Sequence, residues 1–163
     1  MKNFQKAFIV LHFSLMMMFF GGAILETFVN YPNWFRDVPA SLEVTRNFLQ
    51  VRNPGNFFQI IFPLTILSGI VFVILAWQRK AARNWILFSI LLGVAIEALT
   101  IGLIYPKIGI MINEGAQAHS AEMLKQTAQE FVRLHWFRMI AMCVSIVASL
   151  NGFLSFFRQD EIK

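Results

Sequence analysis

The sequence contains few charged residues and only one cysteine. Of its 163 residues, 14% are charged and 57% are hydrophobic, whereas an average soluble domain carries about 25% charged residues. So few charges cannot cover the surface of a water-soluble globule, which excludes an ordinary soluble domain. The single Cys143 excludes an intrachain disulfide, a CxxC redox pair and a zinc site built on several thiolates.

The net charge of +5 is not concentrated in one basic patch. Lysines and arginines stand between apolar runs, a pattern typical of the flanks of membrane helices, where cations face the cytoplasm and anionic lipid headgroups. We therefore expect membrane lipids, and no nucleic acid, as partners. The sequence leaves the oligomeric state open.

Four long apolar runs dominate the chain and cover about residues 7–28, 58–77, 85–105 and 134–157. A helix needs roughly 20 residues to cross the ~30 Å hydrocarbon layer. None of the runs alternates in polarity as the strands of a membrane barrel do. The sequence predicts an all-α fold, a single membrane domain over residues 1–163 built as a four-helix bundle.

The distribution of cations predicts the orientation. With the N-terminus inside, segments 1–6, 78–83 and 158–163 hold seven Lys/Arg, and the longer outer segments 29–56 and 106–134 hold six. The higher density favours both termini in the cytoplasm, with the protein in the inner (plasma) membrane of the cell.

A signal peptide is the competing interpretation of the first helix. Lys2 and Lys6 precede an apolar run that reaches the small residues Gly21-Gly22-Ala23. The apolar character continues to Val29, so we expect this helix to be retained in the bundle.

The first outer connection predicts a short extra helix between Ala40 and Val51. Its apolar residues Leu42, Phe48 and Leu49 stand among charged ones, as in a helix that lies on the membrane surface or caps the bundle.

The second outer connection predicts two turns and the start of a long helix. The turns are expected at Tyr105-Pro106 and near residues 113–115. Ser120 is the expected N-cap of a helix that begins at Ala121 and continues into the fourth span.

Ionisable side chains within the apolar runs are the strongest functional signal. Helical rise places Glu97 about 12 Å and Arg138 about 5 Å inside the outer boundary, with Glu26 near the outer end of the first span. Charges in lipid are costly unless they are paired or functional, and polar residues in membranes face other helices. We expect Glu26, Glu97, His135 and Arg138 to converge in the bundle interior.

Three interpretations of this cluster remain open. In a structural network, Arg138 neutralises one carboxylate and the other is protonated or paired with His135. In a pocket that opens towards the outer loops, a carboxylate or His135 transfers protons on a lipophilic substrate. A metal site would use Glu26, Glu97 and His135, with or without His119, but no ligand pair has the spacing of adjacent helical turns, and we assign no metal.

A haem held by His12 and His135 is excluded. The two histidines lie in opposite leaflets, and one iron cannot bridge that gap.

Four segments of the chain resemble the anthrone oxygenase-like family of small bacterial and fungal membrane proteins. They are the stretch 21–34 (GGAILETFVNYPNW), Asn53-Pro54-Gly55 into Phe57-Phe58, Thr100 to Pro106, and Leu134-His135-Trp136-Phe137-Arg138 with its His-x-x-Arg. The resemblance implies a four-helix membrane bundle. It also implies an oxidation of anthrones to anthraquinones by molecular oxygen, with no cofactor.

The resemblance further implies roles for residues. His135 would deprotonate an acidic C–H of the substrate and Arg138 would steady the resulting anion, with Glu26 and Glu97 as further catalytic candidates. The matched segments supply the candidate substrate-binding residues Asn30, Trp34, Thr100 and Trp136.

Two functional hypotheses follow, and the sequence does not decide whether the chain is an enzyme. The first is cofactor-independent oxidation of a lipophilic aromatic molecule. The alternative is a non-catalytic membrane protein, a small-ligand binder or an accessory subunit, whose intramembrane charges are structural.

Overall fold

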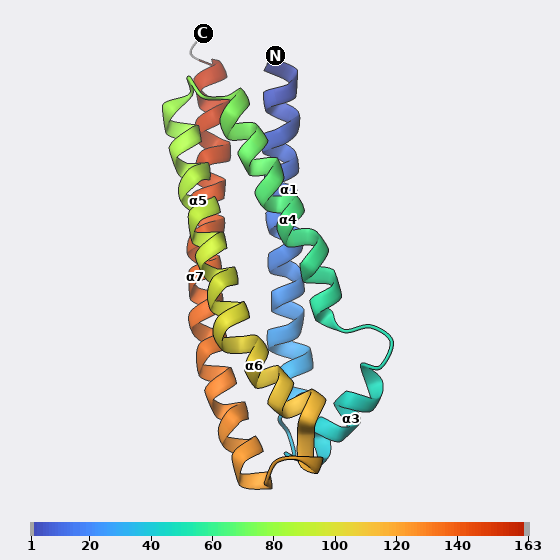
Figure 1. Cartoon of the computed structure of the whole chain (residues 1–163). Helices are drawn as coiled ribbons and strands as arrows, with labels where there is room; N and C mark the ends of the chain where they lie inside the picture. The colour runs from blue at the N-terminus through green and yellow to red at the C-terminus, as the bar shows by residue number, and fades with distance from the viewer. Residues whose placement is uncertain (1, 162–163) are drawn as a thin grey trace.

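The structure is a computed structural model that describes residues 2–161, with side chains as far as residue 158. Every regular element in this part of the chain is helical, which confirms the predicted all-α bundle. Four helical rods run up and down, and the two termini lie at the same end, the terminal end (Figure 1). All four rods are long and apolar enough to cross a membrane.

The first two rods and the segment between them are formed by α1 (Lys2–Leu25), the π-helical turn η1 (Glu26–Asn30), α2 (Tyr31–Trp34), α3 (Ala40–Phe48) and α4 (Pro54–Leu75). The last two are formed by α5 (Lys80–Leu99), the π turn η2 (Thr100–Ile104), α6 (Tyr105–Ile108), the π turn η3 (Gly109–Glu114), the 3₁₀ turn η4 (Gly115–Gln117) and α7 (Ala121–Glu161).

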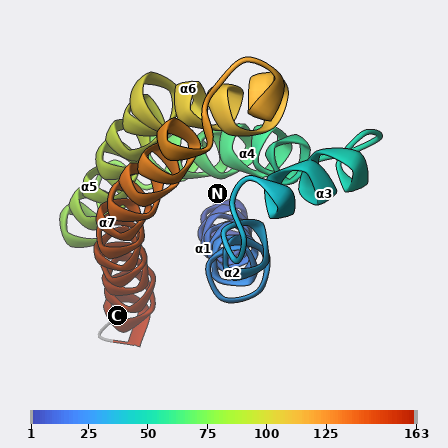
Figure 2. The same ribbon diagram turned by 90° about the horizontal axis from the view of Figure 1, so that it is seen from below.

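The bundle consists of two closely packed pairs. Helix α5 packs along α7, and α1 packs along α4. Near the terminal end the pairs close on a core whose residues Ile9, Phe72, Ile86 and Phe156 are fully buried. Towards the opposite end, the loop end, α3 lies on the side of the bundle away from α5 and α7 (Figure 2).

Buried polar residues join the helices within the apolar interior. The hydroxyls of Ser89 and Ser145 lie 3.0 Å apart, and each also donates to the other residue's carbonyl. His12 Nδ1–H donates to the Thr65 carbonyl over 3.0 Å. These bonds connect α5 to α7 and α1 to α4, as expected where small and polar side chains face other helices.

Substitution of Gly69 should destabilise the α1–α4 contact. A Cβ at this position would lie 2.8 Å from His12 Nδ1 and 2.9 Å from Ile90 Cδ1. Because the imidazole is buried and held by Thr65, we expect Gly69→Ala to cost about 1–3 kcal/mol through overpacking. Gly21→Ala is the matched control, since a Cβ there meets nothing within 4 Å. Melting temperatures in detergent should fall for the first variant and stay level or rise for the second.

The structure confirms three of the features expected in the connections and contradicts one. The short helix is α3, and α7 begins at Ala121 with the Met123 N–H bonded to Ser120 Oγ at 3.3 Å. The turn near residues 113–115 is also confirmed, because η3 ends at Glu114 and the next residue, Gly115, adopts a φ of 61°. The turn expected at Tyr105-Pro106 is wrong, because the helical rod passes through that dipeptide.

Candidate functional site

A cavity of about 670 Å³ lies at the loop end of the bundle. Residues from all four rods and from α3 line it, so it lies between the two helix pairs. A space of this size is within the range of about 300–1,000 Å³ that small-molecule sites occupy.

The walls of the cavity change in polarity with depth. Glu26, Glu97 and Arg138 come from three different rods, and Arg46 reaches the cavity from α3. Apolar side chains form the inner part, and Phe19, seven residues before Glu26 on the same rod, lies about 10 Å deeper by helical rise. The remaining inner residues are Ala23, Phe58, Ile96 and Met142, and the remaining polar ones include Gln50, Gln59, Thr100, Tyr105 and Asn113.

In the part of the chain that the structure describes, no ion pair joins Arg138 to a carboxylate. Arg138 lines the same cavity as Glu26 and Glu97, and the charged pair Lys107–Glu130 lies elsewhere at the loop end. The guanidinium binds other partners instead. Its Nη2 donates to His135 Nδ1 at 2.9 Å and approaches the Tyr31 hydroxyl at 3.4 Å.

His135 is buried beside the cavity and is not part of its lining. The Thr27 hydroxyl donates to the Ala23 carbonyl at 2.6 Å, so it accepts from His135 Nε2–H at 2.8 Å. The other ring nitrogen, Nδ1, accepts from Arg138. This hydrogen-bond network assigns the neutral Nε2–H tautomer. Both ring nitrogens are occupied, and the imidazole orients Arg138.

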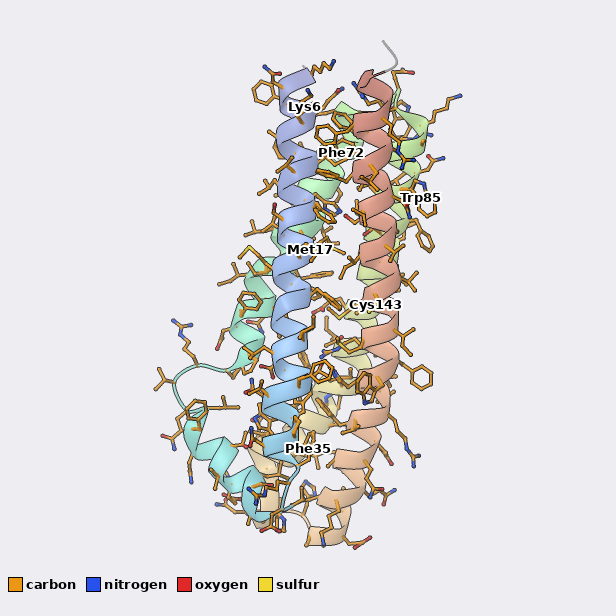
Figure 3. All side chains as sticks on the ribbon, turned by 180° about the vertical axis from the view of Figure 1, so that it is seen from behind. Lys6, Met17, Phe35, Phe72, Trp85 and Cys143 are labelled. Atoms are coloured by element: carbon orange, nitrogen blue, oxygen red, sulfur yellow. The ribbon has the colours of Figure 1, made fainter. Side chains whose placement is uncertain are left out.

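An aromatic cluster encloses this imidazole at the loop end. The His135 ring lies parallel to the Phe131 ring, with 6.2 Å between the ring centroids. It packs edge to face with Tyr31, with 4.7 Å between the centroids. Phe35, labelled in Figure 3, extends the cluster by packing on Tyr31 and Phe131. The cluster separates the imidazole from the outside of the bundle.

Glu26 and Arg138 each keep a buried polar atom without a partner in the described structure. Glu26 is only 4% exposed; its Oε1 accepts from Asn30 Nδ2 at 2.5 Å, while Oε2 has no hydrogen bond. Arg138 Nε is likewise unpaired. Buried polar atoms are normally hydrogen-bonded, and both of these atoms belong to residues that line the cavity.

Two π turns bring the polar residues to the cavity. The Tyr31 N–H bonds to the Glu26 carbonyl and the Tyr105 N–H to the Thr100 carbonyl, each five residues back. Both tyrosines precede a proline, whose ring would clash with the carbonyl four residues earlier in an ordinary α-helix. The wider turn accommodates the proline, which is why the rod passes through Tyr105-Pro106. Such π-bulges are frequent at functional sites.

The tyrosines of these motifs were missed in the sequence. Tyr31 and Tyr105 both line the cavity. The signal that would have found them is a repeated spacing, in which a polar residue precedes Tyr-Pro by five positions: Glu26 before Tyr31-Pro32, and Thr100 before Tyr105-Pro106.

The predicted substrate-binding residues occupy different places. Trp34 and Thr100 line the cavity, whereas Asn30 stands behind it and holds Glu26. Trp136 is half exposed on the opposite side of α7 and packs edge to face with Phe28 at 6.4 Å.

The metal-site interpretation has no ligand set. Nowhere among the described residues do three His, Cys, Asp or Glu side chains come close enough to hold a metal ion together. His119 is bonded to Glu114 instead.

The chain matches no protein-family model, no curated protein and no solved structure.

Proposed function

We propose that the cavity binds a small, flat, membrane-soluble aromatic molecule and oxidises it with molecular oxygen, as the resemblance to anthrone oxygenases implies. The observation that supports this proposal is that Glu26 and Arg138, which each have a buried polar atom without a partner in the described structure, line one cavity. In our proposal the protein lies in the inner membrane with both termini in the cytoplasm, so the cavity opens on the outer side.

The cavity is suited to an aromatic ligand with one polar edge. The apolar inner part reaches about 10 Å below the charged residues, and Phe19 and Phe58 supply aromatic walls there. A carbonyl or phenol oxygen of the ligand would then lie at the level of Arg138, with its ring system directed inwards.

Glu26 is better placed than His135 to be the base. The imidazole has no free nitrogen and lies outside the lining, whereas the carboxylate has a free oxygen and is held in position by Asn30. Holding a catalytic group in one orientation in a site shielded from water favours proton transfer. His135 therefore becomes a positioning residue for Arg138.

The proposed reaction balances without a further reductant. Glu26 takes the acidic C–H proton, and the electron pair moves to the ligand's carbonyl oxygen, where Arg138 stabilises the enolate. The enolate carbon reduces O₂ and forms a C–O bond, the peroxide takes up a proton, and loss of water leaves a second carbonyl. In sum, one anthrone and one O₂ give one anthraquinone and one H₂O.

Anthrone turnover in detergent or nanodiscs tests the proposal. Purified protein should consume oxygen and form anthraquinone in a 1:1 ratio, measured with an oxygen electrode and by absorbance. Arg138→Leu is the control, because it keeps the bulk of the side chain and removes the charge. A rate no higher than that of this variant, or of detergent alone, would contradict the enzymatic function.

The saturated hydrogen bonding of His135 also favours the alternative, a non-catalytic ligand binder. Trp34 lines the cavity, so a bound aromatic molecule should quench its fluorescence. In a Trp34→Phe variant, quenching should fall. Quenching of the native protein without any oxygen uptake would support the binder and exclude the oxidase.

A further inference from the structure

Helix α3 has two apolar faces, and only one of them is buried. Leu42 is buried in a hydrophobic core at the loop end (the loop-end core), which also contains Trp34, Ile104 and Phe131. Leu49 packs against the same core from just beyond the end of the helix. On the other face, Val44 and Phe48 are 69% and 83% exposed, and Val51, three residues beyond the end of the helix, is 89% exposed. A segment with apolar residues on both sides is typical of one that is covered on both sides.

The position of this outward face relative to the membrane follows from α4. With 22 residues, α4 is about 33 Å long, close to the ~30 Å thickness of the hydrocarbon layer. Its first residue, Pro54, therefore lies near the boundary. Val51 is three residues earlier and, at ~3.5 Å per residue, no more than about 11 Å from it.

The connection between α3 and α4 is held at this level. A capping box fixes the start of α4, in which the Asn53 N–H donates to Asn56 Oδ1 at 2.9 Å. Arg52, exposed beside Val51, supplies a cation at the depth where lipid phosphates lie. Figure 1 shows α3 rising from the loop end towards the start of α4.

We propose that the outward face, consisting of Val44 and Phe48 on α3 with Val51 and Arg52 beyond its end, lies in the headgroup region of the membrane leaflet at the loop end. Its partner is the lipid surface. Apolar side chains inserted at the headgroup–acyl boundary, with cations beside them, are the usual features of an interfacial helix. This inference does not depend on any reaction in the cavity.

The position of α3 also sets the level of one wall of the cavity. Arg46 on the same helix, together with Leu49 and Gln50 after it, lines the cavity. In our proposal this wall therefore lies at the level of the lipid headgroups.

Spin labels in nanodiscs that contain anionic lipid test the lipid contact. Native Cys143, exposed on α7 within the apolar run (Figure 3), gives a reference for hydrocarbon. Glu122→Cys, in a Cys143→Ser background, gives a reference for water because Glu122 is exposed at the start of α7. Phe48→Cys in the same background reports on α3.

We expect the label at position 48 to collide with a water-soluble nickel chelate several-fold less often than the label at 122, and with oxygen more often. Nickel collisions equal to those at 122 would mean that the face lies in water. Low collision rates with both reagents would mean that another protein covers it. Either result overturns the proposal.

A second variant tests whether the contact depends on the apolar side chains. A label at Val51→Cys should become accessible to the nickel chelate when Phe48→Glu is added, because an acidic residue is repelled from anionic headgroups. The fold should survive, since Phe48 is exposed. Asn47→Glu, which adds the same charge beside the apolar face, is the matched control and should change the Val51→Cys signal less. An unchanged signal with Phe48→Glu would contradict insertion.

Discussion

Replacing Glu26 with glutamine is expected to lower the rate of anthrone oxidation at least about 100-fold, because a general base contributes roughly 10²–10⁴ to a rate. The amide keeps the size of the side chain, and its oxygen still accepts from Asn30, so the cavity should keep its shape. Ligand affinity, measured by Trp34 quenching, should change only a few-fold. Initial rates of oxygen uptake provide the measurement.

Two further variants locate the base. Glu130→Gln removes a carboxylate that is paired with Lys107 away from the cavity and should leave turnover unchanged. Glu97→Gln removes the other carboxylate of the cavity, which is less buried and has no hydrogen bond among those described. If oxidation survives Glu26→Gln and is lost in Glu97→Gln, the base is Glu97.

Replacing His135 with phenylalanine should destabilise the protein through Arg138. Phenylalanine keeps the shape of the ring, but the Arg138 guanidinium loses its 2.9 Å hydrogen bond to His135 Nδ1. It keeps only the 3.4 Å contact with the Tyr31 hydroxyl. A lost hydrogen bond to a charged group costs about 1.5–3 kcal/mol. We expect a lower melting temperature in detergent and a large loss of ligand affinity.

The double variant His135→Phe with Arg138→Leu separates stability from function. Replacing both partners of a buried hydrogen bond with apolar groups can be nearly neutral for stability, so the melting temperature should recover. Ligand binding should remain lost, because the cavity then has no cation at that depth. A double variant as unstable as His135→Phe alone would show that the imidazole stabilises the bundle through its hydrogen bond to Thr27 and not through Arg138.

The sequence predicted the bundle and part of the site. Apolar runs of about 20 residues determine helical spans almost by themselves, and the cost of charge in lipid places Glu26, Glu97 and Arg138 towards one interior space. The role of His135 was harder to see. Its distance of three residues from Arg138 puts both on one helix face, which allows an intrahelical bond that removes the imidazole from the cavity.

The continuation of the third rod through Tyr105-Pro106 could not be read from local preferences. Proline favours a turn or a helix boundary at the preceding residue, and this preference is correct in most sequences. Here the helix widens by one residue instead, and packing on α7 and the loop-end core stabilises the wide turn. The outcome depends on contacts between segments that are distant in sequence.

The two wide turns also make the length of each segment matter. A π turn holds about one residue more than an α turn. Removing one residue from Glu26–Asn30, or from Thr100–Ile104, would leave an ordinary α turn, and the chain beyond it would keep nearly the same phase because either kind of turn completes about one revolution. The ring of Pro32 or Pro106 would then clash with the carbonyl four residues earlier, so a single-codon deletion in either segment would kink the rod at the cavity while the count of apolar residues hardly changed.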